Sequence, residues 1–118
     1  MLPITPERLA GVYEMLRAFP PFSRWKLPAS EEVGFHVAKT PRWHAAWWID
    51  GSTHHVEVSK QKHYHLSSLA ASMAHEMIHM RQRLTKTETK GAEHNAEFHQ
   101  LAKLVCRRLG FDLGQFNG

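Results

Sequence analysis

Near the start of the chain, hydrophobic residues recur at helical spacing. The residues before them are typical of the start of a helix: Thr5 as the N-cap, Pro6 in the first turn, and the acidic Glu7 beside it. The apolar positions that follow are spaced as on one helix face: Leu9, Val12, Tyr13, Leu16 and Phe19. The pattern predicts a first helix that runs to about Ala18, and the two prolines that follow would stop it. An irregular, proline-punctuated stretch should then continue to about Ser30.

The segment 32–60 has a different hydrophobic pattern, with the period of a β-strand. Apolar and small or polar residues alternate over 33–37 and again over 55–59, and the segment 43–49 is aromatic and β-prone. Asp50 and Gly51 form a hairpin signal between the second and third of these runs. The sequence therefore predicts three short strands, of which the last two are joined by a turn.

Two further helices are expected after the strands. Ser67 or Ser68 can cap a long helix that reaches about Leu84, and a polar loop separates it from a last helix over about 92–109. Gly110 is the natural C-terminal stop of that last helix. The order of helix, small three-stranded sheet, helix and helix predicts an α+β domain.

Composition narrows the class of protein. The chain has 118 residues, of which 42% are hydrophobic, so residues 1–118 should form a single domain with a small core. Its one cysteine, Cys106, excludes an intrachain disulfide framework and a four-cysteine zinc site, and is consistent with a reducing compartment. The N-terminus has no signal-peptide pattern and no window is long enough to span a membrane, so we expect a cytoplasmic protein.

The formal net charge is +4, and the basic residues gather toward the C-terminal end of the chain. They are Arg81, Arg83, Lys86, Lys90, Lys103, Arg107 and Arg108. This distribution permits contact with DNA through a basic face without demanding it, and a solvated face is an equal alternative. Trp43, Trp47 and Trp48 are interpreted as core and sheet-face packing rather than as a base-stacking platform.

His75, Glu76 and His79 form an H-E-x-x-H sequence within the predicted long helix. Residues four apart on a helix point the same way, so the two imidazoles could bind one zinc ion beside a glutamate that acts as general base. The chain has 10 histidines, and a chain so rich in histidine can contain this motif by chance. The surroundings of the motif therefore have to support it.

The apolar residues of the predicted long helix lie opposite the two histidines when 100° is assigned to each residue. These apolar residues are Leu69, Met73, Met77, Met80 and Leu84. On the histidine side, the neighbours one and two turns back are Ser72 and Ser68, which are small enough to leave room for a metal ion and a substrate.

A catalytic zinc ion usually has three protein ligands. The candidates for the third are on the predicted last helix: Glu93, His94, Glu97 and His99. The buried stripe of that helix is expected to contain Phe98, Leu101, Ala102, Val105 and Leu109. Relative to this stripe, His94 in the first turn is the candidate that points inward, so we expect it to complete the site. The alternative is a histidine at the edge of the core that is satisfied by a backbone carbonyl.

Residues 75–79 (HEMIH) and, after fourteen further residues, 94–98 (HNAEF) resemble the SprT-like metallopeptidases, the family of bacterial SprT and the eukaryotic protease Spartan. The family signature is H-E-x-x-H followed on the next helix by H-G-x-x-F, and Asn95 stands here where the family prefers glycine. The resemblance covers about 33–110. It implies a zincin-like core in which His75, His79 and His94 hold Zn²⁺ and the last helix carries the third ligand. The zinc ribbon of many members has no counterpart in the sequence.

The resemblance also implies hydrolysis of peptide bonds in protein substrates, including DNA-associated ones. Glu76 would take a proton from the attacking water and pass it to the leaving amine. By analogy with related zinc peptidases, the substrate would lie extended along the segment 56–59 or along the strand paired with it.

Two alternatives remain open. In a non-catalytic zinc module that binds nucleic acid, a fourth protein ligand such as His99 or Glu97 would close the site. In a gluzincin-like enzyme, Glu97 would replace His94 as third ligand. Other histidines are interpreted as residues of the sheet face or surface rather than ligands: His36, His44, His54 and His55. The residues just before the long helix could supply a transition-state helper, although a polar loop is favoured there: His63, Tyr64 and His65.

Overall fold

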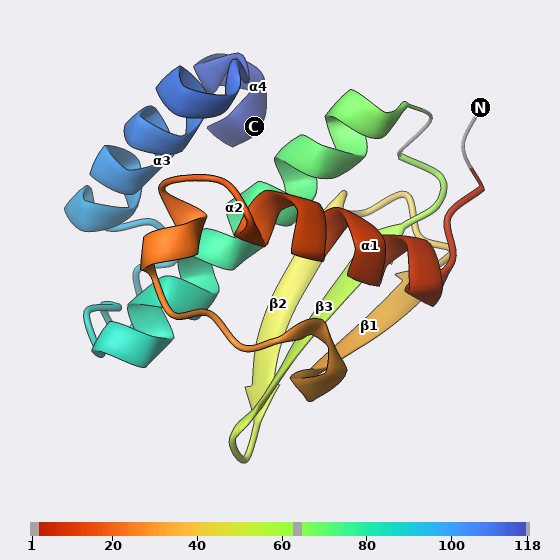
Figure 1. Cartoon of the computed structure of the whole chain (residues 1–118), viewed down its shortest axis with the longest axis horizontal. Coiled ribbons are helices and arrows are strands. Elements are labelled where there is room, and N and C mark those ends of the chain that lie inside the picture. Colours follow the sequence, from red (N-terminus) through yellow and green to blue (C-terminus); the bar gives the residue numbers. More distant parts are fainter. Residues whose placement is uncertain (1–2, 63–64, 118) are drawn as a thin grey trace.

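A computed structural model describes residues 3–62 and 65–117 of the chain (Figure 1). Its elements, in chain order, are α1 (Pro6–Arg17), β1 (Val33–Ala38), β2 (Ala45–Asp50), β3 (Thr53–Ser59), α2 (Leu66–Thr85), α3 (Ala96–Leu109) and the short α4 (Leu113–Asn117). Two 3₁₀ turns, η1 (Phe22–Arg24) and η2 (Ser30–Glu32), lie between α1 and β1. The predicted α+β order of helix, three strands and two helices is therefore confirmed, and α4 is an addition that the sequence patterns did not predict.

The sheet is mixed, with the strand order β1-β3-β2. β1 pairs with β3 in parallel, and β2 pairs with β3 antiparallel. Asp50 pairs with Thr53, so the predicted hairpin has a two-residue turn in which Gly51 has a φ of +61°, a conformation that favours glycine. Because β3 is the central strand, both of its edges are already paired. The expectation that a peptide could add along 56–59 is therefore wrong for that strand, and it can hold only for the strands paired with it, β1 and β2, which are the two edges of the sheet.

The two helices α1 and α2 cover one face of the sheet, and α3 and α4 pack against the far side of α2 (Figure 1). Thr5 caps α1 as predicted, because its hydroxyl oxygen accepts a hydrogen bond from the backbone N–H of Arg8 at 3.2 Å. Most of the predicted apolar face residues of α1 and α2 are buried in the core: Leu9, Val12, Tyr13, Leu16, Leu69, Met73, Met77 and Met80. Two are not. Phe19 lies beyond the end of α1 and is 50% exposed, and Leu84 in the last turn of α2 is 45% exposed.

The start of α3 differs from the prediction in a way that bears on the site. The helix begins at Ala96 rather than at about Ala92, because Asn95 is its N-cap and accepts a hydrogen bond from the backbone N–H of Phe98 at 2.9 Å. His94 therefore lies in the loop before the helix and not in its first turn. Gly110 ends α3 in the left-handed conformation, as predicted.

Within the described ranges 3–62 and 65–117, no helix has the length and apolar character needed to cross a membrane.

Candidate metal centre

The structure brings together the three histidines that the sequence predicts as ligands. His75 and His79 lie one turn apart on α2, and His94 approaches them from the loop that precedes α3. One ring nitrogen from each lies within 4.8 Å of the other two, and the Nε2 atoms of His75 and His94 are 3.1 Å apart. Two nitrogen ligands of a tetrahedral zinc ion, each about 2.0–2.1 Å from the metal, are roughly 3.3 Å apart. The three imidazoles can therefore share one ion.

A backbone carbonyl fixes the orientation of His75. Its Nδ1 lies 3.0 Å from the carbonyl oxygen of Phe116 in α4. Because a carbonyl can only accept, Nδ1 carries the hydrogen and the lone pair of Nε2 faces the other two histidines. This is the outer-shell arrangement typical of metal-binding histidines. Sequence reasoning missed α4, and its only signal was the helical spacing of Leu113 and Phe116.

Phe98 packs against all three histidines and is fully buried. Its ring centroid lies 4.9 Å from that of His75, 4.8 Å from His79 and 4.1 Å from His94, and the last pair is stacked with an interplanar angle of 10°. The sequence placed Phe98 in the apolar stripe of the last helix, where it is. Its role as a common apolar support for the three imidazoles was not predicted.

Burial keeps the histidines neutral. Loss of hydration lowers the pKa of His75 to about 4 and that of His79 to about 3, and it also lowers the pKa of His94. A metal ion binds the neutral imidazole, so the site holds the required form at neutral pH without a prior loss of protons.

Glu76 is a buried carboxyl group beside these histidines, with a relative exposure of 6%. Burial raises its pKa to about 8, and the negative charge of Glu93 contributes to the rise. Among the residues that the structure describes, none forms a hydrogen bond or ion pair with this carboxyl group. The site thus combines three neutral imidazoles with a buried carboxyl group that has no partner among the described residues. None of these four side chains carries a positive charge at neutral pH. The residues present therefore fit a divalent cation such as zinc.

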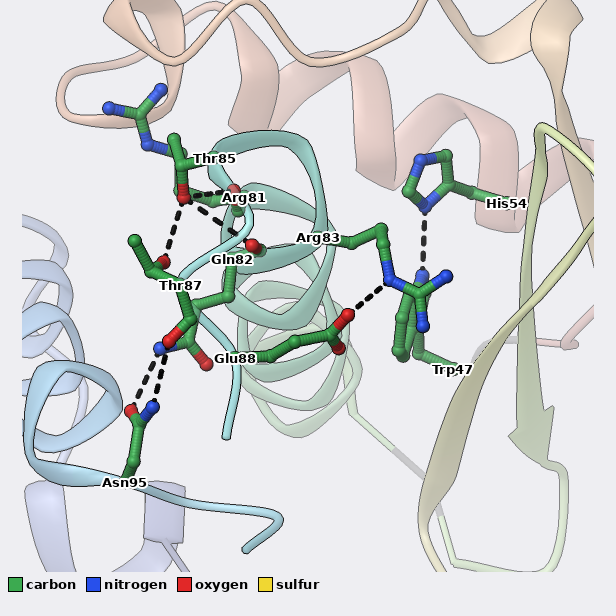
Figure 2. A network of polar contacts seen from close by, with 9 residues as sticks. All are labelled: Trp47, His54, Arg81, Gln82, Arg83, Thr85, Thr87, Glu88 and Asn95. Atoms are coloured by element: carbon green, nitrogen blue, oxygen red, sulfur yellow. Dashed lines mark hydrogen bonds and ion pairs between the residues drawn. The ribbon is translucent and has the colours of Figure 1, made fainter. Parts of the chain in front are cut away.

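A polar network connects α2 to the loop that carries His94 (Figure 2). Gln82 is 2% exposed, and its amide nitrogen donates to the side-chain oxygen of Asn95 at 2.8 Å and to the carboxylate of Glu97 at 2.9 Å. The Asn95 amide in turn donates to the backbone carbonyl of Thr87 at 2.9 Å. These bonds hold the chain on both sides of the α2–α3 loop and thereby position His94. The φ of Asn95 is −84°, so this position does not require the glycine of the family signature.

The same network bears on the alternative ligands. The Glu97 carboxylate accepts hydrogen bonds from Gln82 and from the hydroxyl group of Thr87, and these contacts direct it to the loop. His99 is exposed on α3, and its ring centroid is 6.2 Å from that of His94. Within the described ranges, the cluster of candidate ligands contains no atom from either residue. The structure therefore brings His94, and neither Glu97 nor His99, to the two histidines of α2.

A groove of about 960 Å³ borders the histidine cluster. Its walls contain residues of β2, the inner side of α2, including Glu76 and His79, and the α2–α3 loop from Glu88 to Glu93. β2 is an edge strand, and no described strand pairs with its other side. The groove thus joins a strand edge to the candidate general base.

Trp47 on β2 lines this groove and stacks on one of the histidines. Its ring lies parallel to that of His79, with a centroid distance of 5.9 Å and an interplanar angle of 15°. The indole N–H donates to Nδ1 of the buried His54 at 3.0 Å, and the Arg83 guanidinium lies 5.4 Å above the Trp47 ring while it pairs with Glu88 (Figure 2). Trp47 is therefore a packing residue, as predicted, and His54 is a buried hydrogen-bond acceptor on the face of the sheet.

Of the three residues considered as a source of a transition-state helper, His63 and Tyr64 lie outside the described residues. His65 is the exposed N-cap of α2.

The chain matches no model of a known protein family, and no curated protein is significantly similar to it.

Proposed function

We propose that this protein is a zinc-dependent metallopeptidase of the SprT-like type, with a zincin-like core, and that it hydrolyses peptide bonds of protein substrates. One observation carries the proposal: nitrogen atoms of His75, His79 and His94 converge beside the buried Glu76, which lines a groove along an edge strand. Three neutral ligands and a carboxyl group at the same groove are the parts that hydrolysis at a zinc site requires.

The histidines would hold the zinc ion, which when bound supplies positive charge that polarises a substrate carbonyl and acidifies a water molecule. Glu76 accepts the proton of the attacking water and transfers it to the leaving amine. In the metal-free protein burial raises its pKa to about 8. A bound dication would lower that pKa, so the carboxylate form that accepts the proton would be available near neutral pH. Phe98 and the Phe116 carbonyl keep the imidazoles in place during these transfers.

The substrate backbone would pair with the unpaired edge of β2. This strand forms one wall of the groove, so a peptide added to its edge runs past Glu76 and His79. Main-chain hydrogen bonds to a strand edge give affinity with little dependence on side chains. Trp43 and Trp47 add apolar surface along the same wall.

Contact with DNA remains a separate prediction. Two of the basic residues that suggested it already have partners within the chain: Arg81 donates to the carbonyl of Trp25, and Arg83 forms an exposed ion pair with Glu88. Lys103 and Arg107 are exposed one turn apart on α3 and are the residues we expect to contact a polyanion. The buried free thiol of Cys106 is compatible with the cytoplasmic location that we also propose.

The experiment is a comparison of zinc content and cleavage of an unfolded protein substrate. Glu76→Gln should keep the zinc ion held by the three histidines and lose at least ~10²-fold in cleavage rate, because only the proton acceptor is removed. His94→Ala should lose both that zinc ion and cleavage. Glu31→Gln, which changes an exposed carboxylate outside the groove, is the matched control and should retain both. Full cleavage by Glu76→Gln would contradict the proposal, and retention by His94→Ala of the zinc ion at His75 and His79 would point to the gluzincin-like alternative. Absence of cleavage in the unaltered zinc protein would favour the non-catalytic module.

A further inference from the structure

The face of the sheet turned away from α1 and α2 carries a second group of histidines. Along β1, β2 and β3 the side chains alternate between the two faces of the sheet. The residues that adjoin the buried Val33, Val56 and Val58 in sequence therefore point to the opposite face, and most of them are exposed or half-buried. Among the side chains on that outer face are those of His36, Trp48, His55 and Glu57. None of them belongs to the candidate metal centre, which lies beyond the other face.

The register of the strands places these side chains next to one another. His55 on the central strand is paired with Trp48 on one side and with Gly34 on the other, and the next pair along β1 and β3 is His36 with Glu57. Nε2 of His36 lies 2.9 Å from Nδ1 of His55. The Trp48 ring stacks on both imidazoles, at 5.1 Å from His55 with an interplanar angle of 7° and at 5.4 Å from His36.

Gly34 gives the His55 ring the space that it occupies. A Cβ atom at position 34 would lie 2.3 Å from Nδ1 of His55 and 3.2 Å from Nε2 of His36. Any other residue would therefore displace the very nitrogen atoms that face each other. Glycine is unfavourable inside a strand, and it often marks a place where another group approaches the backbone closely. Here Gly34 on one side and Trp48 on the other direct His55 toward His36.

The separation of the two nitrogens is close to that in the candidate metal centre. There, Nε2 of His75 and Nε2 of His94 are 3.1 Å apart, and two nitrogens bound to one tetrahedral ion are roughly 3.3 Å apart. Imidazole nitrogen is a preferred ligand of copper(II), nickel(II) and zinc(II). Glu57, next to His55 on the same face, supplies a negative charge that favours a cation at this place.

We propose that His36 and His55 form a second metal site, which binds one divalent transition-metal ion of the copper, nickel and zinc series on the outer face of the sheet. The two ligands come from β1 and β3, so the ion would link the parallel pair of strands. The site is more exposed than the centre on α2, and solvent would complete the coordination. It is independent of the proposed peptidase activity, since it shares no residue with that centre.

The test is the number of zinc ions bound at saturation, measured by equilibrium dialysis of the folded protein. The unaltered chain should bind two equivalents, and His36→Ala and His55→Ala should each bind one. Gly34→Ala should also lose the second equivalent while its circular dichroism spectrum stays folded. His99→Ala, which removes an exposed histidine on α3, is the matched control and should still bind two.

Nickel(II) provides an independent signal, because a paramagnetic ion beside Trp48 quenches its fluorescence. When the protein already carries one equivalent of zinc, added nickel should quench the unaltered chain and the His99→Ala variant but neither His36→Ala nor His55→Ala. Binding of a single equivalent that persists in both His36→Ala and His55→Ala would overturn the proposal, and it would then identify the pair as a simple hydrogen bond. A second equivalent that survives both histidine substitutions would overturn it as well.

Discussion

The two histidine clusters differ in their surroundings although the distances between their nitrogen atoms are similar, 3.1 Å in the centre on α2 and 2.9 Å on the outer face of the sheet. In the centre, the imidazoles are packed on the buried Phe98, and one of them donates to a backbone carbonyl. On the sheet, the pair is shaped only by the absence of a side chain at Gly34 and by the exposed Trp48. A pair of nitrogens at ligand spacing is thus not enough to identify a catalytic site. The buried carboxyl group and the groove beside the first cluster are what distinguish it.

The largest expected effect follows from removal of Phe98, the ring that packs against the three histidines of the centre on α2. Phe98→Ala should lower the free energy of unfolding by about 3–5 kcal/mol, because it leaves a cavity at a fully buried position. It should also weaken zinc binding, because all three imidazoles rest on this ring. Chemical denaturation and competition with a chromophoric chelator measure the two effects.

Phe22→Ala is the matched control for that substitution. Phe22 is equally buried, but it packs against Trp25 rather than against the histidines. It should lose similar stability and keep the zinc affinity of the unaltered protein. Equal losses of zinc affinity in the two variants would show that Phe98 acts on the centre only through global stability.

The charge state of the buried carboxyl gives the next effect. In the metal-free folded protein the pKa of Glu76 is about 8, above its ordinary value. The Glu76 carboxyl therefore loses its proton less readily in the folded protein than in the unfolded chain. Its contribution to stability is present at low pH and is lost as pH rises toward 8, by about 2 kcal/mol between pH 6 and pH 8. The buried histidines act in the opposite direction over the same range, because the lowered pKa values of His75 and His79 favour protonation of the unfolded chain at pH 6. The Glu76 contribution is therefore measured as the difference in thermal stability between metal-free Glu76→Gln and the unaltered metal-free protein, which should be larger at pH 8 than at pH 6.

Glu76→Gln should remove most of this dependence, so the variant should be more stable than the unaltered metal-free protein at pH 8. Zinc should have a similar effect, since a nearby dication favours the carboxylate. An unchanged pH profile in Glu76→Gln would mean that the carboxyl is not buried beside the histidines as described.

Two neighbouring tryptophans on β2 provide the smallest and most selective comparison. Trp47 stacks on His79, and Trp48 stacks on His36 and His55. Trp48→Phe should change stability by less than about 1 kcal/mol, because the ring remains and the side chain is partly exposed. It should leave cleavage and both zinc equivalents unchanged.

Trp47→Phe keeps a ring against His79 but loses the hydrogen bond to His54, which leaves a buried acceptor without its donor. It should reduce cleavage several-fold with a smaller change in zinc content. Steady-state kinetics on the two variants make this comparison. Equal activities would show that the hydrogen bond from Trp47 to His54 has no part in the reaction.

The parts of the site that could be predicted from sequence depend on local geometry. His75 and His79 are four residues apart on one helix, so their common direction follows from helical periodicity alone. The three strands and their hairpin followed in the same way from alternation and from a glycine at the turn. Strand order did not, because nothing local to 53–59 indicates that β3 pairs on both sides.

His94 lies beside the other two histidines as expected, but the premise of that expectation is contradicted by the structure. The projection assumed a helix over 92–109, whereas Asn95 caps the helix and leaves His94 in the preceding loop. Its position comes from Gln82, which is thirteen residues away from Asn95 in sequence and binds it from α2. Contacts of this kind, like the carbonyl that Phe116 offers to His75, depend on tertiary packing and have no signature in a short window of sequence.

The most direct test of the zinc centre is anomalous diffraction at the zinc edge from crystals of the zinc-loaded protein. We expect an anomalous peak within bonding distance of one nitrogen each of His75, His79 and His94, with no fourth protein ligand and with the Glu76 carboxyl facing the open position. A peak coordinated in addition by Glu97 or His99, or no peak at these three histidines, would contradict the proposal of a catalytic zinc centre.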